Sequence, residues 1–445
     1  MILLTQTSPP PVPTGDKQGG EARARWAWTE ASVWSEPMLT TLERGIKGGK
    51  WFSLMDKAWN PRNLESSWHK VQRNGGAAGV DRQSVAHFAR HEASNLERIH
   101  RHLREGTWEP QPVRRTWIDK PGSPDKRPLG IPNVSDRIVQ GALRHVLEPI
   151  FEHTFSEYSY GFRPGRGAKD ALRRVDGLLK AGRAWVVDAD IKGYFDAIPH
   201  DQLMDCLKQK VSDGRVLALV EKYLKAGVMD SISGWSPGER GTPQGAVLSP
   251  LLANLYLNEL DHLMAARGYA ITRYADDFVI LTNTESEARE ALRLLQEWTA
   301  RRELTLHPEK TRLIDTSIKG EGFDFLGYRF QNGGKWPRKK SLQKLRDTVR
   351  QRTPRLNGRS LEAIIAGLNP VLRGWFAYFK HSAKTNLREM DQFVRRRLRS
   401  MLRRRLGGKG TTGMGRDHNR WPNTFFTARG LFCLAAARER ICQSR

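Results

Sequence analysis

The chain has 445 residues, enough for roughly two to four domains, and its 74 lysines and arginines against 48 aspartates and glutamates give a net charge of +26 and a pI near 10.3. This charge favours nucleic acid or another anionic surface as the partner. No run of about 18 apolar residues exists, which excludes a membrane-spanning helix. The three cysteines form no CxxC pair, which argues against a zinc site or a disulfide framework and predicts a reducing cytosol.

The first part of the chain is expected to be a tail followed by helices. Residues 1–25 lack a basic segment ahead of a long apolar run, which predicts a disordered tail rather than a signal peptide. Residues 26–70 carry six tryptophans on short helical patterns and predict a helical N-terminal extension. Proline, glycine and basic residues alternate over 110–135, which predicts two strands joined by a basic hairpin, and residues 136–153 predict a helix.

Strands and helices alternate through the middle of the chain. Apolar runs predict strand structure at 185–191, 270–282 and 323–330, and the leucine spacing after residue 248 predicts an amphipathic helix. After residue 340 the composition becomes helical and basic to about residue 405, and a glycine-rich stretch follows.

Most of the excess charge lies in the last quarter of the chain. Residues 331–445 hold 28 lysines and arginines against 6 acidic residues, a net of +22, whereas residues 1–330 have a net of only +4. A solvated helix face is the simpler explanation of such a run. Aromatic residues interrupt the run, however, and this pattern favours phosphate contacts with bases stacked on rings. The aromatic residues are Trp336, Trp375, Phe376, Tyr378, Phe379 and Trp421.

Aspartates stand where two strand-like runs end. In WVVDAD, Asp188 and Asp190 are two residues apart, so on a strand both side chains lie on one face. In RYADDFVILT, Asp276 and Asp277 lie between two apolar runs, as at the tip of a hairpin. If the strands pair, Asp190 faces Asp276 and Asp277, and three carboxylates form a site for hard divalent cations, Mg²⁺ first among them. The simpler alternative is an Asp-Asp turn with an unrelated aspartate nearby.

Two such ions about 4 Å apart stabilise the attacking and leaving oxygens of an in-line displacement together. A carboxylate site of this kind therefore indicates phosphoryl or nucleotidyl transfer.

Eight sequence blocks, in this order, resemble the group II intron reverse transcriptases, also called maturases. The blocks are GGAAGVD (75–81), KPGSPDKRPLGIP (120–132), YSYGFRPGRGAKDAL (158–172), VVDADIKGYFDAIPHD (186–201), GTPQGAVLSPLLANLYL (241–257), RYADDF (273–278), LTLHPEKTRL (304–313) and GFDFLGYRF (322–330). The stretch GLNPVLRGWFAYFK (367–380) resembles the family's thumb, or maturase-specific segment, and the resemblance covers roughly residues 66–445.

The resemblance implies an α+β fold of the right-hand polymerase type, with fingers, palm and thumb. The expected domains are a disordered tail (1–25), a helical N-terminal extension (26–70), reverse transcriptase fingers and palm (71–335), a basic helical thumb/maturase-specific domain (336–405) and a basic C-terminal nucleic-acid-binding tail (406–445). Many relatives carry an appended endonuclease whose zinc needs paired cysteines. No such pair flanks His418 and Asn419, so no endonuclease is expected.

Asp190, Asp276 and Asp277 match the family's metal-binding acids. The resemblance implies that they are the catalytic residues of a two-metal nucleotidyl transfer with Mg²⁺, for which Mn²⁺ can substitute. Ile191 would lend a backbone carbonyl to a metal ion. Asp188 is expected to stay outside the ligand shell as a hydrogen-bonded structural acid.

Basic residues near the site are expected to contact the incoming nucleotide. Lys120 and Arg127 lie seven residues apart on the basic fingers hairpin and would clamp the triphosphate as pyrophosphate leaves. A solvated basic loop is the alternative. Lys310 would help to bind the phosphates, and solvation at a helix end is its alternative.

Phe195, Gln244 and Gly245 are expected to shape the rest of the nucleotide pocket. The Phe195 ring would wall the sugar and reject a 2′-hydroxyl by steric clash. Gln244 and Gly245 would offer an amide donor and a bare backbone. A core phenylalanine and a turn glycine are the alternatives.

Basic residues of the thumb and tail, with one tryptophan, are predicted to contact nucleic acid. They are Arg338, Lys339, Lys340, Arg373, Trp375, Arg395, Arg396, Arg397, Arg403, Arg404 and Arg405.

The leading hypothesis is an RNA-directed DNA polymerase that binds a group II intron RNA, assists its splicing and copies it into DNA for retrohoming. Its expected partners are structured intron RNA, an RNA template with a DNA primer, target DNA and deoxynucleoside triphosphates, in the bacterial cytosol and away from membranes. Two alternatives stay open. One is a domesticated reverse transcriptase acting in host defence or DNA repair without an intron, and the other is an RNA-binding splicing factor with an inert polymerase. The sequence leaves the oligomeric state open.

Overall fold

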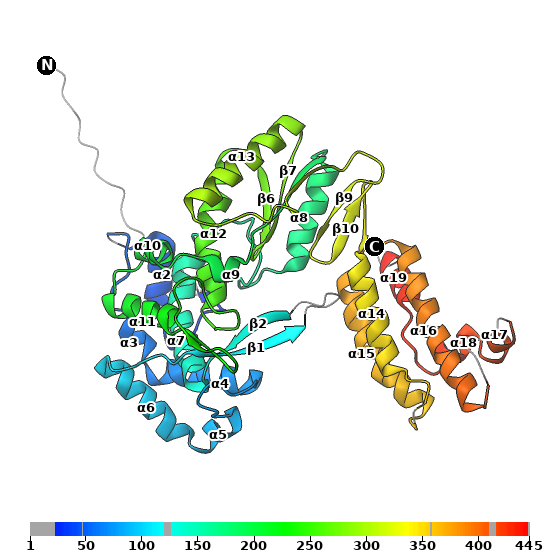
Figure 1. Cartoon of the computed structure of the whole chain (residues 1–445), viewed down its shortest axis with the longest axis horizontal. Coiled ribbons are helices and arrows are strands. Elements are labelled where there is room, and N and C mark those ends of the chain that lie inside the picture. Colours follow the sequence, from blue (N-terminus) through cyan, green and yellow to red (C-terminus); the bar gives the residue numbers. More distant parts are fainter. Residues whose placement is uncertain (1–22, 47, 120–125, 357, 409–414, 444–445) are drawn as a thin grey trace. The chain divides into compact units, whose positions relative to one another are not determined.

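The computed structural model describes residues 23–46, 48–119, 126–356, 358–408 and 415–443 (Figure 1). Residues 1–22 of the predicted tail and Lys120 therefore lie outside the described residues. The chain divides into two compact units. The first comprises Met1–Thr116, Pro128–Phe155 and Gly193–Asn258, and the second comprises Trp117–Arg127, Ser156–Lys192 and Glu259–Arg445.

The first unit is built around helix α7 (Val134–Glu152), most of whose residues are buried. It packs against α4 (Pro61–Asn74), and Gly141 is the point of close approach, because a Cβ there would lie 2.2 Å from the Ser67 Oγ. The Ser67 hydroxyl instead donates a hydrogen bond to the Ile138 carbonyl at 2.7 Å. The other helices of this unit are α2 (Glu36–Arg44), α3 (Met55–Ala58), α5 (Val85–Arg90), α6 (Glu92–Glu105), α9 (Tyr194–Ala197), α10 (His200–Lys208) and α11 (Gly214–Lys225).

The two strands predicted within 110–135 are present. They are β1 (Val113–Asp119) and β2 (Lys126–Ile131), in a sheet with the order β2-β1-β4-β5 that also contains β4 (Val228–Asp230) and β5 (Gly234–Ser236). The hairpin residues between β1 and β2 lie outside the described residues.

A buried aspartate in the first unit gives stability a pH dependence. Asp136 in the first turn of α7 is 1% exposed and accepts a hydrogen bond from the Tyr223 hydroxyl at 3.2 Å. Burial raises the pKa of the Asp136 carboxyl from 3.8 to about 7. Between these two pKa values the folded chain holds a proton on Asp136 that the unfolded chain has released. The contribution of Asp136 to the free energy of unfolding is therefore fully present in acid. It is lost as the pH rises through the window between these two values.

We expect Asp136→Asn to remove this loss, because the amide keeps an acceptor for Tyr223 and carries no charge. The urea unfolding midpoint should fall less between about pH 5 and about pH 8 in the variant than in the wild type. The variant should also be the more stable protein at the higher pH, by about a few kcal/mol at most. Parallel pH profiles for the two proteins would contradict the assignment.

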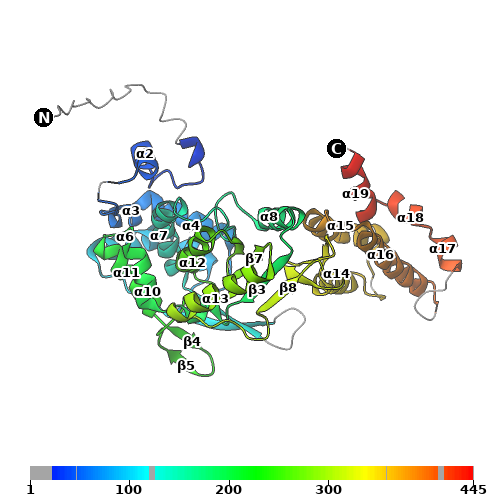
Figure 2. The same cartoon turned by 90° about the horizontal axis from the view of Figure 1, so that it is seen from above.

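The second unit contains a four-stranded antiparallel sheet in the order β6-β7-β3-β8. The central strand β3 (Trp185–Asp190) pairs with β7 (Asp277–Thr282) on one side and β8 (Arg312–Asp315) on the other. The edge strand β6 (Ala270–Tyr274) and β7 form the hairpin predicted at 270–282. Figure 2 shows helices α8 and α13 on opposite faces of this sheet; they are α8 (Ala168–Lys180) and α13 (Glu285–Arg301).

Helix α12 (Ser249–Ala266) contains the boundary between the two units and forms the helix predicted after residue 248.

The strand structure predicted at 323–330 is present, and it is divided between two strands. The chain forms two strands there, β9 (Gly322–Phe325) and β10 (Tyr328–Gln331), which pair antiparallel and continue to β11 (Gly334–Pro337). The turn between β9 and β10 uses positive φ angles, +46° at Leu326 and +83° at Gly327. Glycine adopts such a conformation at little cost, so Gly327 breaks the apolar run into a hairpin.

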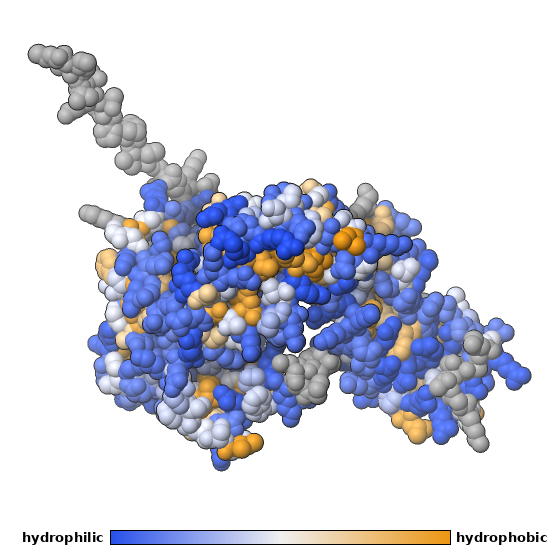
Figure 3. Space-filling model, turned by 45° about the horizontal axis from the view of Figure 1, so that its top comes forward, coloured by the Kyte–Doolittle hydropathy of each residue, from blue (hydrophilic) through white to orange (hydrophobic). Residues whose placement is uncertain are grey.

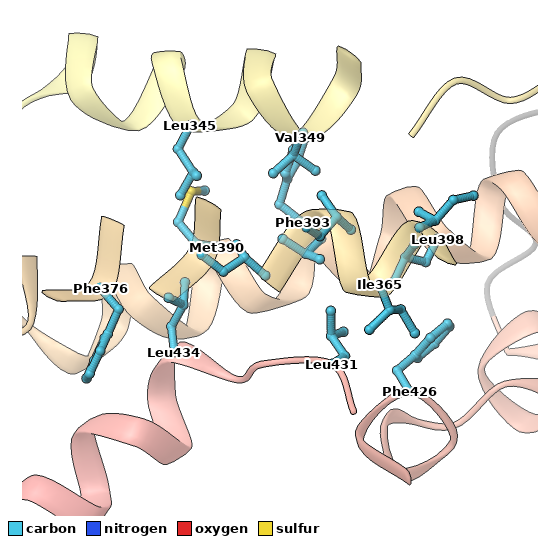
Figure 4. Packing of buried hydrophobic residues seen from close by; sticks show 14 of the residues in the cluster. Leu345, Val349, Ile365, Phe376, Met390, Phe393, Leu398, Phe426, Leu431 and Leu434 are labelled. Atoms are coloured by element: carbon cyan, nitrogen blue, oxygen red, sulfur yellow. The ribbon is translucent and has the colours of Figure 1, made fainter. Parts of the chain in front are cut away.

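The predicted basic helical region forms a bundle of α14 (Lys339–Arg352), α15 (Leu361–Phe379) and α16 (Lys384–Arg405) (Figure 1). Figure 4 shows its shared core, to which Leu345 and Phe393 contribute. The shorter helices that complete the chain are α17 (Arg416–Arg420), α18 (Asn423–Ala428) and α19 (Leu434–Gln443).

The expectation that the aromatic residues of this region stack on bases is wrong for three of them. Phe376, Phe379 and Trp421 are each 7% exposed and belong to hydrophobic cores, because the helices need apolar faces to pack. On the face shown in Figure 3, the helices after residue 339 present mainly hydrophilic side chains. Within the described ranges, no helix has both the length and the hydropathy that a membrane span requires.

Candidate active site

Two of the predicted catalytic acids lie directly opposite each other. Asp190 ends β3 and Asp277 begins β7, and the antiparallel register pairs these two residues. Directly paired residues project to the same face of a sheet, as do residues two apart on one strand. Asp188, Asp190 and Asp277 therefore share one face of the β6-β7-β3-β8 sheet.

Asp276 stands in the tight turn between β6 and β7. The preceding residue, Ala275, has a φ of +59°, a left-handed conformation that is costly for a residue with a side chain. The structure around the turn must therefore hold it in place.

A buried ion pair provides one hold on this turn. Arg273 and Asp261 both have fully buried side chains, and the Arg273 Nη2 lies 2.6 Å from the Asp261 Oδ2. The Arg273 Nε donates to the same carboxylate at 2.8 Å, and the Arg273 Nη1 donates to the Ala275 carbonyl at 2.9 Å. The guanidinium thus ties the strained residue beside Asp276 to helix α12. No role was predicted for either member of this pair.

A glycine closes the other side of the turn. A Cβ at Gly161 would lie 2.3 Å from the Ala275 nitrogen, closer than any real contact, so only glycine fits there. The chain before Gly161 runs parallel to β6 at this point, because the Tyr160 amide donates to the Arg273 carbonyl at 2.8 Å. The block that contains Gly161 therefore supports the Asp276–Asp277 turn.

The acids oppose one another's ionisation. Although part of the Asp277 side chain is open to solvent, the protein around its carboxylate raises the pKa of Asp277 to about 7. The negative charges of Asp276, Asp188 and Asp190 add to this rise. Loss of solvent also raises the pKa of Asp276, and the charge of Asp190 contributes. A cation at this position would relieve the repulsion.

A lysine ammonium already contacts the first acid. The Lys310 Nζ lies 2.6 Å from the Asp190 Oδ2. The segment that carries it is fixed by the backbone, since the His307 amide donates to the Asp190 carbonyl at 2.7 Å and Leu306 pairs with Ile191. Lys310 was expected at the phosphates or in solvent, and in this structure it is ion-paired with Asp190.

Asp188 has a different environment from the other acids. Its carboxylate receives a hydrogen bond at 3.0 Å from Arg312 on the neighbouring strand β8. Loss of solvent raises the pKa of Asp188, and Arg312 counteracts the rise. A carboxylate already paired in this way matches the structural role expected for it.

The donor chemistry fits a hard divalent cation. In the described part of the chain, no three acidic, histidine or cysteine side chains converge closely enough to form a metal-binding group. Asp190, Asp276 and Asp277 nevertheless supply carboxylate oxygens whose charges are mutually unfavourable, and oxygen ligands are those that Mg²⁺ and Mn²⁺ prefer. Ile191 is 3% exposed and follows Asp190 directly.

Three of the predicted nucleotide-pocket residues lie in linked segments of the first unit. The Phe195 carbonyl accepts a hydrogen bond from the Thr242 amide at 2.7 Å, which ties the Phe195 segment to the loop containing Gln244. The Gln244 carbonyl in turn accepts a bond at 2.7 Å from the Gly130 amide of β2. Gly245 has a φ of +108°, and a Cβ there would lie 2.4 Å from the Gly130 oxygen. The backbone at Gly245 therefore requires glycine.

Arg127 lies on β2 with an exposed side chain. Its positive charge lowers the pKa of Asp276, against the larger effect of lost solvent. Arg127 thus places a positive charge near Asp276. A positive charge beside the acids is what is expected of a residue that binds phosphate there.

The predicted nucleic-acid-binding residues fall into different environments. The guanidinium of Arg397 donates to the Thr353 carbonyl at 2.7 Å and so joins α16 to the end of α14. The guanidinium of Arg403 lies 3.5 Å from the Asp417 carboxylate, and that of Arg405 donates to the Arg359 carbonyl at a short distance. The exposed members of the set are Lys339, Lys340, Arg373, Arg396, Arg404 and Arg405, while Arg338 and Arg395 are half-buried.

Trp375 is half-buried and packs against two hydrophobic clusters, with its ring 4.7 Å from that of Phe379. The packing leaves less of this ring for stacking on a base than the sequence suggested.

Two sequence families match this chain. Residues 118–330 match the family described as "Reverse transcriptase (RNA-dependent DNA polymerase)", and residues 342–420 match "Group II intron, maturase-specific domain". The chain is 34% identical over 292 residues to Protein YkfC of Escherichia coli K12, and the match covers 56% of this chain and 75% of YkfC.

Other relatives match over shorter shares of their length. The chain is 44% identical over 166 residues to the group II intron-encoded protein LtrA of Lactococcus lactis subsp. cremoris, and the match covers 37% of this chain and 27% of LtrA. This chain thus spans about a quarter of the length of LtrA. Among solved structures, a partial Cas6-RT-Cas1–Cas2 complex matches 56% of this chain and 41% of its own, with 25% identity and a TM-score of 0.37.

Proposed function

Because the chain belongs to the family of group II intron reverse transcriptases and maturases, we propose that it is an RNA-directed DNA polymerase that also binds a group II intron RNA and assists its splicing. The observation that carries the polymerase half is the strand register that sets Asp190 opposite Asp277, with Asp276 in the adjoining turn. The match to the maturase-specific domain and the basic helices after residue 339 support the splicing half.

The proposed reaction joins the 3′-hydroxyl of a DNA primer to the α-phosphorus of a deoxynucleoside triphosphate, and pyrophosphate leaves. Two divalent ions, Mg²⁺ or Mn²⁺ in its place, would supply charge stabilisation to the attacking and leaving oxygens when bound by Asp190, Asp276 and Asp277. The protein must hold these acids in position. The Arg273–Asp261 pair does so for the β6–β7 turn, because Arg273 also donates to the Ala275 carbonyl.

Basic side chains of the chain would bind the triphosphate. Lys310 lies beside Asp190, with which it is ion-paired, and Arg127 on β2 places a positive charge near Asp276. Positive charges preorganised around a departing pyrophosphate stabilise the negative charge that develops on it.

The test of the polymerase proposal is primer extension by the purified chain. A DNA primer annealed to an RNA template, with deoxynucleoside triphosphates and Mg²⁺, should yield product that reaches the template end. A parallel assay asks whether the chain accelerates splicing of a group II intron RNA transcribed from the DNA around its gene. No extension with either Mg²⁺ or Mn²⁺ would overturn the polymerase proposal, and extension without splicing assistance would overturn the maturase half.

We expect Phe195→Val to weaken discrimination against ribonucleotides. Phe195 is half-buried, and its ring lies 5.6 Å from that of Tyr194, so a smaller side chain would open a pocket edge without emptying a core. Ribonucleotide incorporation relative to deoxynucleotide incorporation should rise by about tenfold or more.

Phe195→Tyr is the matched control, because it keeps the ring and should keep the discrimination. If both variants fold and both retain the wild-type ratio of the two incorporations, Phe195 does not wall the sugar.

A further inference from the structure

A cavity in the C-terminal helical bundle is lined by arginines from two helices. Its volume is about 780 Å³, and it lies among α14, α16, α17 and α18. The arginine cavity, as we name it, is lined by Gln343, Arg346, Arg350, Glu389, Gln392, Phe393, Arg395, Arg396, Arg399, His418 and Asn423. It belongs to the second unit alone and is separate from the acids on the β6-β7-β3-β8 sheet.

The cavity has a large excess of positive charge. Five guanidinium groups and one carboxylate, that of Glu389, line it. Among the described residues, no ion pair or hydrogen bond engages the guanidinium groups of Arg346, Arg395 or Arg396, so their donors are available to a ligand. A site with several guanidinium groups free for bidentate contact is suited to phosphate.

One arginine forms a rigid wall of the cavity. Arg399 is 2% exposed, and its Nε donates to the Trp421 carbonyl at 2.9 Å while its Nη2 donates to the Asn423 Oδ1 at 2.9 Å. Burial and the charge of Arg395 both lower the pKa of Arg399. The guanidinium charges here repel one another, and an anion in the cavity would relieve that repulsion.

An aromatic ring orients two of the other guanidinium groups. The Arg350 and Arg396 groups lie 5.4 Å and 5.6 Å from the centre of the Phe393 ring. Phe393 is itself 8% exposed and is anchored in the core that α14 and α16 share (Figure 4). Flat guanidinium planes held in this way are platforms on which an unstacked RNA base packs.

The remaining polar groups suit a base rather than phosphate alone. Gln343, Gln392 and Asn423 offer amides that both donate and accept hydrogen bonds. The volume is in the range of sites that enclose one small ligand. A double helix is too wide to enter such a cavity, whereas a nucleotide extruded from a loop or bulge fits.

We propose that the arginine cavity binds one unpaired nucleotide of a folded RNA, with its phosphate on the free guanidinium groups and its base against the Arg350–Phe393–Arg396 platform. The inference rests on the proposed maturase function and deepens it. It assigns to the bundle a site that recognises a single-stranded position in the RNA in addition to general attraction by positive charge.

The test uses two RNA probes and two pairs of substitutions. The probes are an RNA duplex with an unpaired bulge and the same duplex without it. The cavity variant is Arg346→Gln with Arg396→Gln. The matched control is Lys344→Gln with Arg404→Gln, which removes the same charge from the same two helices at exposed positions outside the cavity.

Wild-type protein should bind the bulged probe more tightly than the duplex by about tenfold or more. The cavity variant should lose this preference, while the control variant should keep it and weaken both probes alike. A photoreactive thiouridine placed in the bulge should crosslink to peptides of α14 or α16 in the wild type and not in the cavity variant.

Equal binding of both probes by the wild type, or an unchanged preference in a folded cavity variant, would overturn the inference. Loss of the preference in both variants to the same degree would also overturn it, because charge alone would then explain the binding. Extension of a short primer on an unstructured RNA template by the wild type is measured in parallel, because it depends on the acids of the β6-β7-β3-β8 sheet and not on the cavity. A wild type that extends no primer therefore reports failure of the proposed polymerase and not of the cavity.

Discussion

Replacing Asp276 by asparagine is expected to reduce primer extension on an RNA template by on the order of a thousandfold. The substitution keeps the size of the side chain and removes one of the three carboxylates proposed to bind the metal ions at the β6–β7 turn. Affinity for RNA should stay nearly unchanged, because the basic helices after residue 339 are not altered. The measurement is single-turnover extension together with binding of the same RNA.

Asp188→Asn is the matched control for this experiment. Asp188 lies two residues before Asp190 on the same face of β3, yet its carboxylate is already paired with Arg312 at 3.0 Å. Its substitution should leave extension within about tenfold of wild type. Wild-type extension by Asp276→Asn, or equal losses in the two variants, would refute the assignment of Asp276.

Asp261→Asn is expected to destabilise the chain by about 3–5 kcal/mol, because it leaves the Arg273 charge buried without its partner. Both side chains are fully buried in the native structure. Extension should fall with stability, because Arg273 also holds the Ala275 carbonyl beside the catalytic turn. Urea unfolding and extension rates measured at a temperature where the variant is folded check the two effects separately.

A double variant separates positioning from stability. Asp261→Leu with Arg273→Met removes both charges and should restore much of the lost stability, since apolar residues of similar size often replace buried ion pairs at little cost. The hydrogen bond to the Ala275 carbonyl is still missing, so extension should stay low. Recovery of both stability and extension would show that the pair serves the fold and has no part in placing the turn.

The α+β fold and the core of the site could be predicted from the sequence because they depend on local pattern. The match to the reverse transcriptase family confirms the right-hand polymerase fold that the resemblance implied. The two-residue spacing of Asp188 and Asp190 and the apolar runs on both sides of Asp276 specify strands and a hairpin. The observed register then sets Asp190 opposite Asp277, as the pairing of those strands predicted.

The contacts that support the turn could not be predicted in the same way, because they join segments that no periodicity relates. Arg273 finds Asp261 on helix α12, and Gly161 approaches Ala275 from a separate loop. One signal was present in the sequence: an arginine inside an apolar strand must have a partner, since an unpaired buried charge is very costly.

The run of arginines shows a further limit of sequence patterns. Arg395, Arg396 and Arg397 are identical in type, yet the first two line the arginine cavity and Arg397 joins α16 to α14. Arg399, for which no role was predicted, is the most deeply buried wall of that cavity. Only the orientation of each residue on its helix, fixed by packing of the bundle, separates these roles. Domain boundaries and the binding roles of the individual basic residues stay predictions.

The most direct test of the polymerase centre is a change of metal preference in RNA-templated extension. In Asp276→Cys a thiolate replaces one oxygen ligand, and softer ions accept sulfur far better than Mg²⁺ does. We predict no extension by this variant with Mg²⁺ and partial recovery with Mn²⁺ or Cd²⁺, while Asp276→Ala recovers with neither. Wild-type extension by Asp276→Cys with Mg²⁺, or equal behaviour of the two variants with every ion, would contradict the placement of the catalytic cation at this turn.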